Sequence, residues 1–288
     1  EPFPTLEKRM DCYHVHALPL SIRAIEGCMD HHIDKSDITH LVTVSCTGMS
    51  APGIDIQIMQ EMQLGRSIYR TSVNFMGCYA AIHALKMADA ICTADSSAKV
   101  MIVCTELCTL HFQKEFNMNN MVAALLFSDG AAAVLVTGND HREKGLHISG
   151  FYSEVDLEGK PDMAWNISEK GFLMTLSAYI PQLIQSGIES LLQRTLDTHG
   201  IKKKDITHWA IHPGGKKILQ TVQQELQLQE DDLKCSFEVL RRYGNMSSPT
   251  ILFVLREIMQ QLKWNQKEKI FTSAFGPGLT LETAILQT

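Results

Sequence analysis

KSDITH, at residues 35–40, returns almost unchanged as KKDITH at residues 203–208. Each copy leads directly into a short apolar run typical of a buried strand, residues 41–44 in the first copy and 209–211 in the second. A match of four consecutive residues can arise by chance. The order of elements around both copies is what indicates an internal duplication.

The flanking patterns follow in the same order in both halves. Helix-like amphipathic stretches precede and follow each copy, at 18–29 and 54–62 in the first half and at 180–196 and 217–226 in the second. An Asn that opens a turn comes next, Asn74 or Asn245. A long apolar helix pattern and two strand patterns then complete each half: 79–90, 100–105 and 131–136, against 251–262, 270–274 and 280–286. Alternating helices and strands predict a layered α/β fold with strands buried on both faces.

We therefore expect two similar halves that share one interior. The first, residues 1–138, contains Cys78, and the second comprises residues 139–288, with the seam in the polar, Gly-containing stretch 138–144. In folds of this kind, ligands bind in the crevice at the strand ends between the halves. The functional residues are therefore expected at the turns that follow the strands.

The composition argues against several classes of protein. The formal charge is −6, with 45% hydrophobic and 20% charged residues, which disfavours nucleic acid as the main partner. The sequence has no run of about 18 apolar residues that would predict a membrane span. Its eight cysteines lack the spacing of a disulfide framework or a zinc site, which predicts a reduced, cytoplasmic protein without a metal centre.

Cys78 lies in NFMGCYAA (residues 74–81), where a strand pattern ends, Gly77 permits a sharp turn and a helix pattern begins. A thiol at a helix start feels the positive end of the helix dipole, which is expected to lower its pKa. A strand-to-helix elbow also offers backbone N–H groups to an oxyanion. Cys78 is therefore a candidate nucleophile, and the alternative is a buried structural cysteine.

Two polar residues occupy similar turns in the second half. His212 ends an apolar strand pattern at a Pro-Gly-Gly turn, and Asn245 lies in YGNMSS (residues 243–248). Beside a cysteine, a histidine can raise thiolate character and stabilise negative charge, and a neutral amide can donate to an enolate or oxyanion. A core histidine and a turn asparagine are the alternatives. Cys78, His212 and Asn245 on three similar turns together predict an active site.

The remaining candidate pocket residues are apolar or soft. Phe127 and Met174 are candidate gates, and Cys108 and His111 follow a strand from which they can line a cavity. Phe275-Gly276-Pro277-Gly278 ends another strand and can form a rigid, Gly-lined wall. A packing role in the core is the alternative for the first four side chains, and an ordinary loop for the last stretch.

Taken together, these motifs resemble the type III polyketide synthases, the chalcone-synthase-like branch of the thiolase fold. The matching stretches run in the family's order through nearly the whole chain: SCTG (45–48) with PG (52–53), MGC (76–78), FSDGAA (127–132), IHPGG (211–215), YGNMSS (243–248) and FGPGLT (275–280). The stretches ELCTLHF (106–112) and MAW (163–165) resemble bacterial members more than plant members.

The resemblance implies a thiolase-like, five-layered αβαβα fold made of two duplicated halves, in agreement with the repeat. It implies that Cys78 is the nucleophile and that His212 and Asn245 complete a catalytic triad. Phe127 and Met174 match the two gatekeeper positions. A further set matches cavity-lining positions that set starter size and chain length: Cys46, Cys108, His111, Trp165 and Ser247.

The sequence departs from the family pattern at three places. Ala274 replaces the first Gly of the family's Gly-Phe-Gly-Pro-Gly loop, which reduces local backbone freedom. Ala51 stands where plant members place a Met that reaches into the partner's cavity. The family's N-terminal region, with basic residues that bind coenzyme A phosphates, does not precede Glu1. We therefore expect the chain to be a fragment of a longer protein.

The implied reaction is the loading of an acyl-CoA starter on a cysteine, extension by decarboxylative Claisen condensation with malonyl-CoA, and cyclisation. Acyl-CoA and malonyl-CoA are substrates, no separate cofactor is implied, and the family is expected to act as a cytoplasmic homodimer. Two alternatives remain. One is an initiating 3-oxoacyl-acyl-carrier-protein synthase, which uses the same three residue types on this fold. The other is an inactive thiolase-like partner subunit.

Overall fold

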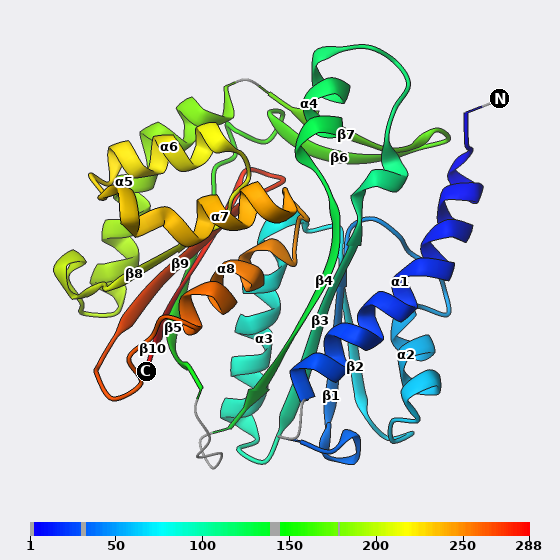
Figure 1. Ribbon diagram of the computed structural model, residues 1–288, viewed down its shortest axis with the longest axis horizontal. Helices are drawn as coiled ribbons and strands as arrows, with labels where there is room; N and C mark the ends of the chain where they lie inside the picture. Colours follow the sequence, from blue (N-terminus) through cyan, green and yellow to red (C-terminus); the bar gives the residue numbers. More distant parts are fainter. Residues whose placement is uncertain (1–2, 30–32, 139–144, 178) are drawn as a thin grey trace.

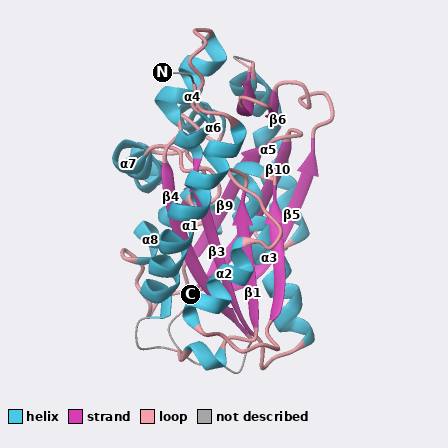
Figure 2. Cartoon of the chain, turned by 90° about the vertical axis from the view of Figure 1, so that its right-hand side faces the viewer, coloured by secondary structure: helices cyan, strands magenta, loops and turns pink. Residues whose placement is uncertain are grey.

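The computed structural model describes residues 3–29, 33–138, 145–177 and 179–288, and it has five layers, αβαβα (Figure 1). Seen from the side, the strands of both sheets run along the long direction of the molecule (Figure 2). One outer layer contains α1 (Leu6–Met29) and α2 (Ile54–Met62). The central layer contains α3 (Ala80–Ala94) and α8 (Thr250–Met259). The other outer layer contains α5 (Ile180–Thr198) and α6 (Lys216–Glu225).

Each half of the chain supplies one four-stranded sheet. The first has the order β2 (Tyr69–Asn74), β1 (His40–Ser45), β3 (Lys99–Leu107) and β4 (Asp129–Thr137); the first three are parallel and β4 is antiparallel. The second has the order β5 (His147–Val155), β10 (Thr280–Gln287), β9 (Lys269–Gly276) and β8 (His208–Ile211); β8 and β9 are parallel and the other pairs are antiparallel. Strands β1, β3 and β4 therefore correspond to β8, β9 and β10.

The repeated motif makes the same contacts in both halves. In the first, the Thr39 N–H donates to the Lys99 carbonyl (3.0 Å) and the Thr39 hydroxyl accepts from the Lys99 N–H (2.8 Å). In the second, Thr207 and Lys269 make the same two bonds, both at 2.9 Å. The threonines thereby join the start of β1 to the start of β3, and the start of β8 to the start of β9. The predicted α/β fold of two duplicated halves is confirmed.

The buried side chains explain why the helices lie in three layers. Helix α3 lies between the sheets and is lined with small residues, of which Ala81, Ala84 and Ala88 have no exposed surface. Small side chains let both sheets approach one helix closely, because a helix in a central layer is buried all round. Separate apolar clusters bind the outer helices, with Ile25 of α1 packed toward the first sheet and Leu191 of α5 toward the second.

The remaining elements lie mostly at one end of the sheets, above the carboxyl ends of the parallel strands (Figure 1). They are the hairpin β6 (Met163–Ser168) and β7 (Gly171–Leu176), helices α4 (Met118–Leu126) and α7 (Lys234–Tyr243), and the short helices η2 (Gly77–Tyr79), η3 (Cys108–His111) and η5 (Glu230–Leu233). Two further short helices, η1 (Lys35–Asp37) and η4 (Lys203–Asp205), belong to the repeated motif.

Two sequence predictions concern the chain as a whole. The proposed seam between the halves falls almost entirely in residues 139–144, outside the described residues, so the division at 138/139 stays a prediction. Among the described helices, none has the length and apolar character needed to cross a membrane.

Candidate active site

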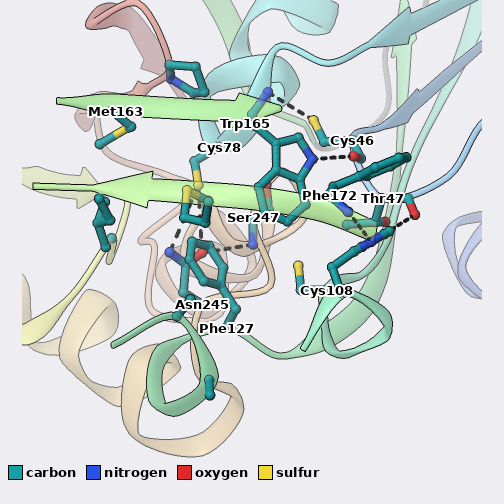
Figure 3. A pocket seen from close by; sticks show the side chains of 18 of the residues that line it. Cys46, Thr47, Cys78, Cys108, Phe127, Met163, Trp165, Phe172, Asn245 and Ser247 are labelled. Atoms are coloured by element: carbon teal, nitrogen blue, oxygen red, sulfur yellow. Dashed lines mark hydrogen bonds between the residues drawn. The ribbon is translucent and has the colours of Figure 1, made fainter. Parts of the chain in front are cut away.

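An apolar cavity of about 120 Å³ lies where the strand ends of the two halves meet (Figure 3). Cys78, His212 and Asn245 all line it, although they are far apart in the sequence. The first follows β2, the second follows β8 and the third follows α7. The fold therefore brings together the three residues that the sequence predicted as a site.

Cys78 lies in the short helix η2, and α3 begins only at Ala80. Gly77 has φ +80°, and a Cβ at this position would lie 2.4 Å from Cδ of Pro277 in the other half. Only glycine meets both demands, the left-handed backbone and the close approach. The nucleophile turn, which we define as residues 77–79, is thus locked against the second half.

Asn245 faces the Cys78 thiol with its amide. The Cys78 Sγ lies 3.9 Å from Oδ1 and 4.0 Å from Nδ2 of Asn245, whose side chain is buried. The Ser247 N–H donates to Oδ1 at 2.8 Å, which fixes the orientation of the amide. With the amide oriented by this bond, its NH2 group, which can only donate, lies on the side of the Cys78 thiol. We call residues 243–248 the asparagine turn.

His212 is 1% exposed, and neither ring nitrogen has a hydrogen-bond partner within the described part of the chain. Its backbone is nevertheless fixed, because the His212 N–H donates to the Ser273 carbonyl of β9 at 2.8 Å. Burial lowers the pKa of His212 to about 3, so the imidazole is neutral at physiological pH. A buried polar ring without a protein partner in an apolar cavity is costly and is typical of a functional group that binds a ligand.

The pKa of Cys78 differs from the sequence-based expectation. Burial raises the pKa of Cys78 to about 11, and the negative charge of Glu106 adds to this effect, while hydrogen bonds from Ser247 and Asn245 act in the opposite direction. The expected lowering by a helix start was wrong, because α3 begins only after η2 and removal of water outweighs the dipole. The resting thiol is therefore protonated near neutral pH.

Three rings form one side of the cavity, which we call the aromatic wall: His111, Trp165 and Phe172. His111 stacks on Phe172 with ring centroids 4.1 Å apart, and the Trp165 ring meets both edge-on. The Trp165 indole N–H donates to the Cys46 carbonyl at 2.7 Å. The Phe172 N–H donates to Nδ1 of His111, so Nε2 carries the proton that binds the Thr47 carbonyl at 2.7 Å. All three side-chain nitrogens of the wall are hydrogen-bonded, which makes it rigid.

The other predicted pocket residues can now be placed. Those that line the same cavity are Phe127, Met174, Cys46, Cys108, His111, Trp165, Ser247 and Phe275. Gly276 does not line it. A Cβ at Gly276 would lie 2.5 Å from the Tyr79 ring, so this glycine serves the packing of the nucleophile turn. Phe172 was missed, although alternation along β7 places it on the same face as Met174.

The comparisons with known proteins agree with this geometry. The family "Chalcone and stilbene synthases, N-terminal domain" matches residues 1–140, and "Chalcone and stilbene synthases, C-terminal domain" matches residues 155–288. The alpha-pyrone synthesis polyketide synthase-like Pks18 of Mycobacterium tuberculosis is 34% identical, over 96% of this chain and 72% of that protein. The chain belongs to the type III polyketide synthases.

Solved structures of this family superpose closely on the synthase. PKS-I from the brown alga Ectocarpus siliculosus has a TM-score of 0.93 at 29% identity, covering 99% of this chain and 78% of that one. The 1,3,6,8-tetrahydroxynaphthalene synthase of Streptomyces coelicolor, a bacterial type III polyketide synthase, has a TM-score of 0.93 at 25% identity, covering 99% and 82%. The predicted family, thiolase-like fold and acyltransferase class are confirmed, and an initiating acyl-carrier-protein synthase is not favoured.

The buried histidines make the stability of the synthase depend on pH. The pKa of His212 is about 3 and that of His111 about 4 in the folded chain, against 6.5 for an ordinary histidine, because burial disfavours the charged form. Between these values and pH 6.5 only the unfolded chain gains these protons, so the free energy of unfolding falls as pH drops.

We expect a contribution of about 1.4 kcal/mol per pH unit from each histidine between pH 6 and 5. Urea denaturation of wild type and His212→Gln at pH 7, 6 and 5 measures the contribution of His212, because all other groups cancel in the comparison. The variant should lose stability less steeply with acid. Equal slopes in the two proteins would contradict a neutral, buried His212.

Proposed function

We propose that the synthase loads an acyl group from a CoA starter onto Cys78, extends it by decarboxylative condensation with malonyl-CoA, and releases a cyclised product. One observation carries this proposal. A thiol, a neutral imidazole without a partner and an amide donor share one apolar cavity, with the thiol 4.0 Å from the amide nitrogen. These are the groups that acyl transfer through a thioester and enolate stabilisation require.

In the loading step, the Cys78 sulfur attacks the thioester carbonyl of the starter. The thiol needs a base because burial keeps the pKa of Cys78 high, and the neutral His212 takes its proton as the sulfur attacks. The developing negative charge stabilises the protonated imidazole and so offsets the burial that lowers the pKa of His212 in the resting site. The C–S bond to coenzyme A then breaks, and its thiolate leaves with that proton. The acyl group remains on Cys78 as a thioester, and His212 is neutral again.

In the extension step, the malonyl thioester carbonyl accepts hydrogen bonds from His212 and from Nδ2 of Asn245. The bond to the carboxylate breaks, carbon dioxide leaves, and the electron pair forms an enolate whose charge these donors hold. The enolate carbon attacks the acyl thioester on Cys78 and releases its sulfur. The chain, longer by two carbons, then returns to Cys78 or cyclises.

Two donors in a dry cavity suffice for this chemistry, so we propose that no metal or separate cofactor takes part. Both substrates are coenzyme A esters. The unpaired state of the described cysteines supports a reducing, cytoplasmic location.

We also propose that the synthase is a homodimer. The edge strand β2 supports this, because five of its six residues are exposed and Tyr69 is 70% exposed. An open edge of this length is a ready site for a strand from a second copy. Native mass spectrometry should give the mass of two chains, and a mass of one chain at micromolar concentration would contradict the proposal.

The proposed reaction is tested with radiolabelled malonyl-CoA and a panel of acyl-CoA starters. Products that contain several malonyl-derived units, formed without acyl-carrier protein, are expected. Incorporation of a single unit, and only from malonyl-acyl-carrier protein, would overturn the proposal in favour of an initiating synthase.

A further inference from the structure

Glu106, near the end of β3, is a carboxylate with no exposed surface that does not line the cavity. Its Oε2 accepts from the Cys46 N–H at 2.9 Å, the Thr47 hydroxyl at 2.8 Å and the Ser45 hydroxyl at 3.4 Å. Its Oε1 accepts from the Ser248 hydroxyl at 2.7 Å. A single buried side chain thus connects the loop after β1 in one half with the asparagine turn in the other.

The hydroxyl protons are directed at this carboxylate by their other partners. The Ser45 hydroxyl already accepts from the Tyr13 hydroxyl at 2.7 Å, and the Thr47 hydroxyl accepts from the Leu107 N–H at 2.9 Å. Each therefore has its own proton free for Glu106. A side chain that only accepts hydrogen bonds matches an ionised carboxylate. Burial raises the pKa of Glu106, and the hydrogen bonds from Ser248, Cys46 and Thr47 act in the opposite direction and favour the ionised form.

The Oε2 side leads to the nucleophile. Cys46 is held by its N–H on Glu106, and its Sγ accepts the Gly77 N–H at 2.9 Å. Gly77 directly precedes Cys78 in the nucleophile turn. The position of the thiol is therefore linked to Glu106 through two intervening residues, Cys46 and Gly77.

The Oε1 side leads to the amide. Ser248 is fully buried and binds Glu106, and it directly follows Ser247, whose N–H fixes Oδ1 of Asn245. The two oxygens of one carboxylate thus hold the two turns on which the thiol and the amide donor lie. We infer that Glu106 is a positioning residue that sets the placement of Cys78 against Asn245.

This inference rests on the proposed function, because positioning matters only if the thiol and the amide act on the same substrate. A displacement of about 1 Å between reacting groups can lower a rate about 100-fold. The two oxygens of Glu106 also predict distinct defects. Loss of the hydrogen bond between Oε2 and Cys46 should slow acyl loading on Cys78, and loss of the hydrogen bond between Oε1 and Ser248 should slow decarboxylation.

The charge of Glu106 gives a second readout that a merely structural residue would not change. Its negative charge raises the pKa of Cys78, so its removal should move thiol ionisation to lower pH. The other titratable side chains around the cavity are Cys46 after β1, Cys108 and His111 in η3, and His212 after β8. These side chains are all present in a Glu106 variant, so a change in the pH at which Cys78 ionises is attributed to the lost charge of Glu106.

The test compares Glu106→Gln, Cys46→Ala and Ser248→Ala. The first measurement is the alkylation of Cys78 by iodoacetamide as a function of pH, with the modified residue identified by peptide mass spectrometry. The second is the rate of malonyl-CoA decarboxylation, and the third is kcat and KM of condensation. In Glu106→Gln we expect kcat to fall about 100-fold with KM within about twofold, and the alkylation midpoint to move to lower pH. Cys46→Ala should slow loading more than decarboxylation, and Ser248→Ala the reverse.

Glu268 offers a matched control, because it is also buried and accepts the Lys263 N–H at 2.8 Å, but precedes β9 at the opposite end of the sheet. Glu268→Gln should leave kcat and the alkylation profile unchanged. The Glu106→Gln/Ser248→Ala double variant should be no slower in decarboxylation than Glu106→Gln, because each change breaks the same Glu106–Ser248 hydrogen bond.

Wild-type kcat and alkylation in Glu106→Gln, or additive losses in the double variant, would overturn the inference. If Glu106→Gln does not fold, Cys46→Ala and Ser248→Ala still test the inference. Loading and decarboxylation slowed to the same extent in both variants would contradict separate roles for the two oxygens of Glu106. Failure of the proposed function looks different: the wild-type protein itself would then show no acylation of Cys78.

Discussion

The Cys78→Ala variant is expected to lose covalent acylation by acyl-CoA completely and to lose condensation by at least about 10⁴-fold. We expect neither of the other two cavity thiols to replace its sulfur, because burial raises the pKa of Cys46 and of Cys108 well above the usual range and the Cys46 sulfur is held by the Gly77 N–H. Intact-protein mass spectrometry after incubation with acyl-CoA measures loading, and radiolabelled malonyl-CoA measures extension.

The matched control is Cys235→Ala in α7, which removes a half-buried thiol that does not line the cavity. It should be acylated on Cys78 at the wild-type rate. Acylation of the Cys78→Ala protein at that same rate would place the nucleophile elsewhere and contradict the proposed mechanism.

The second large effect is expected in Asn245→Asp. Aspartate keeps the shape and the acceptor for the Ser247 N–H, but it replaces the Nδ2 donor with an oxygen that carries negative charge. Loss of one donor to a developing oxyanion costs about 10² to 10³ in rate, and the added charge opposes the enolate further. Decarboxylation of malonyl-CoA should therefore fall by at least that factor, while acyl loading on Cys78 falls less.

Separate assays of the two half-reactions check this result, with Asn166→Ala as a control on the exposed face of the β6–β7 hairpin. Equal losses in loading and decarboxylation would show that Asn245 serves the fold of the cavity and not the enolate.

Much of the architecture could be predicted because it follows from local patterns. The repeated motif located β1 and β8, and the apolar periods located α2, with the bounds 54–62 that the structure has. The candidate site could also be predicted, because Cys78, His212 and Asn245 each lie at a turn that ends a helix or strand pattern. In a layered α/β fold such turns meet at the strand ends.

The rest depends on contacts that no local pattern contains. The raised pKa of Cys78 comes from burial in a cavity that residues of both halves line, which a helix start in the sequence does not report. Gly276 is needed because the Tyr79 ring packs against it, and Glu106 is held by hydrogen bonds from both halves. A buried carboxylate at the end of an apolar strand gives no sign in the sequence of which donors surround it.

The threonine contacts at the far end of the sheets indicate how the two halves have diverged. Thr39 and Thr207 still make the same pair of bonds, and they lie in the one segment where the halves remain visibly alike. At the opposite end the catalytic candidates differ: Cys78 follows β2 in one half, and His212 and Asn245 follow β8 and α7 in the other. The two halves therefore resemble each other where neighbouring strands are joined, and they differ where each supplies its own side chains to the shared cavity.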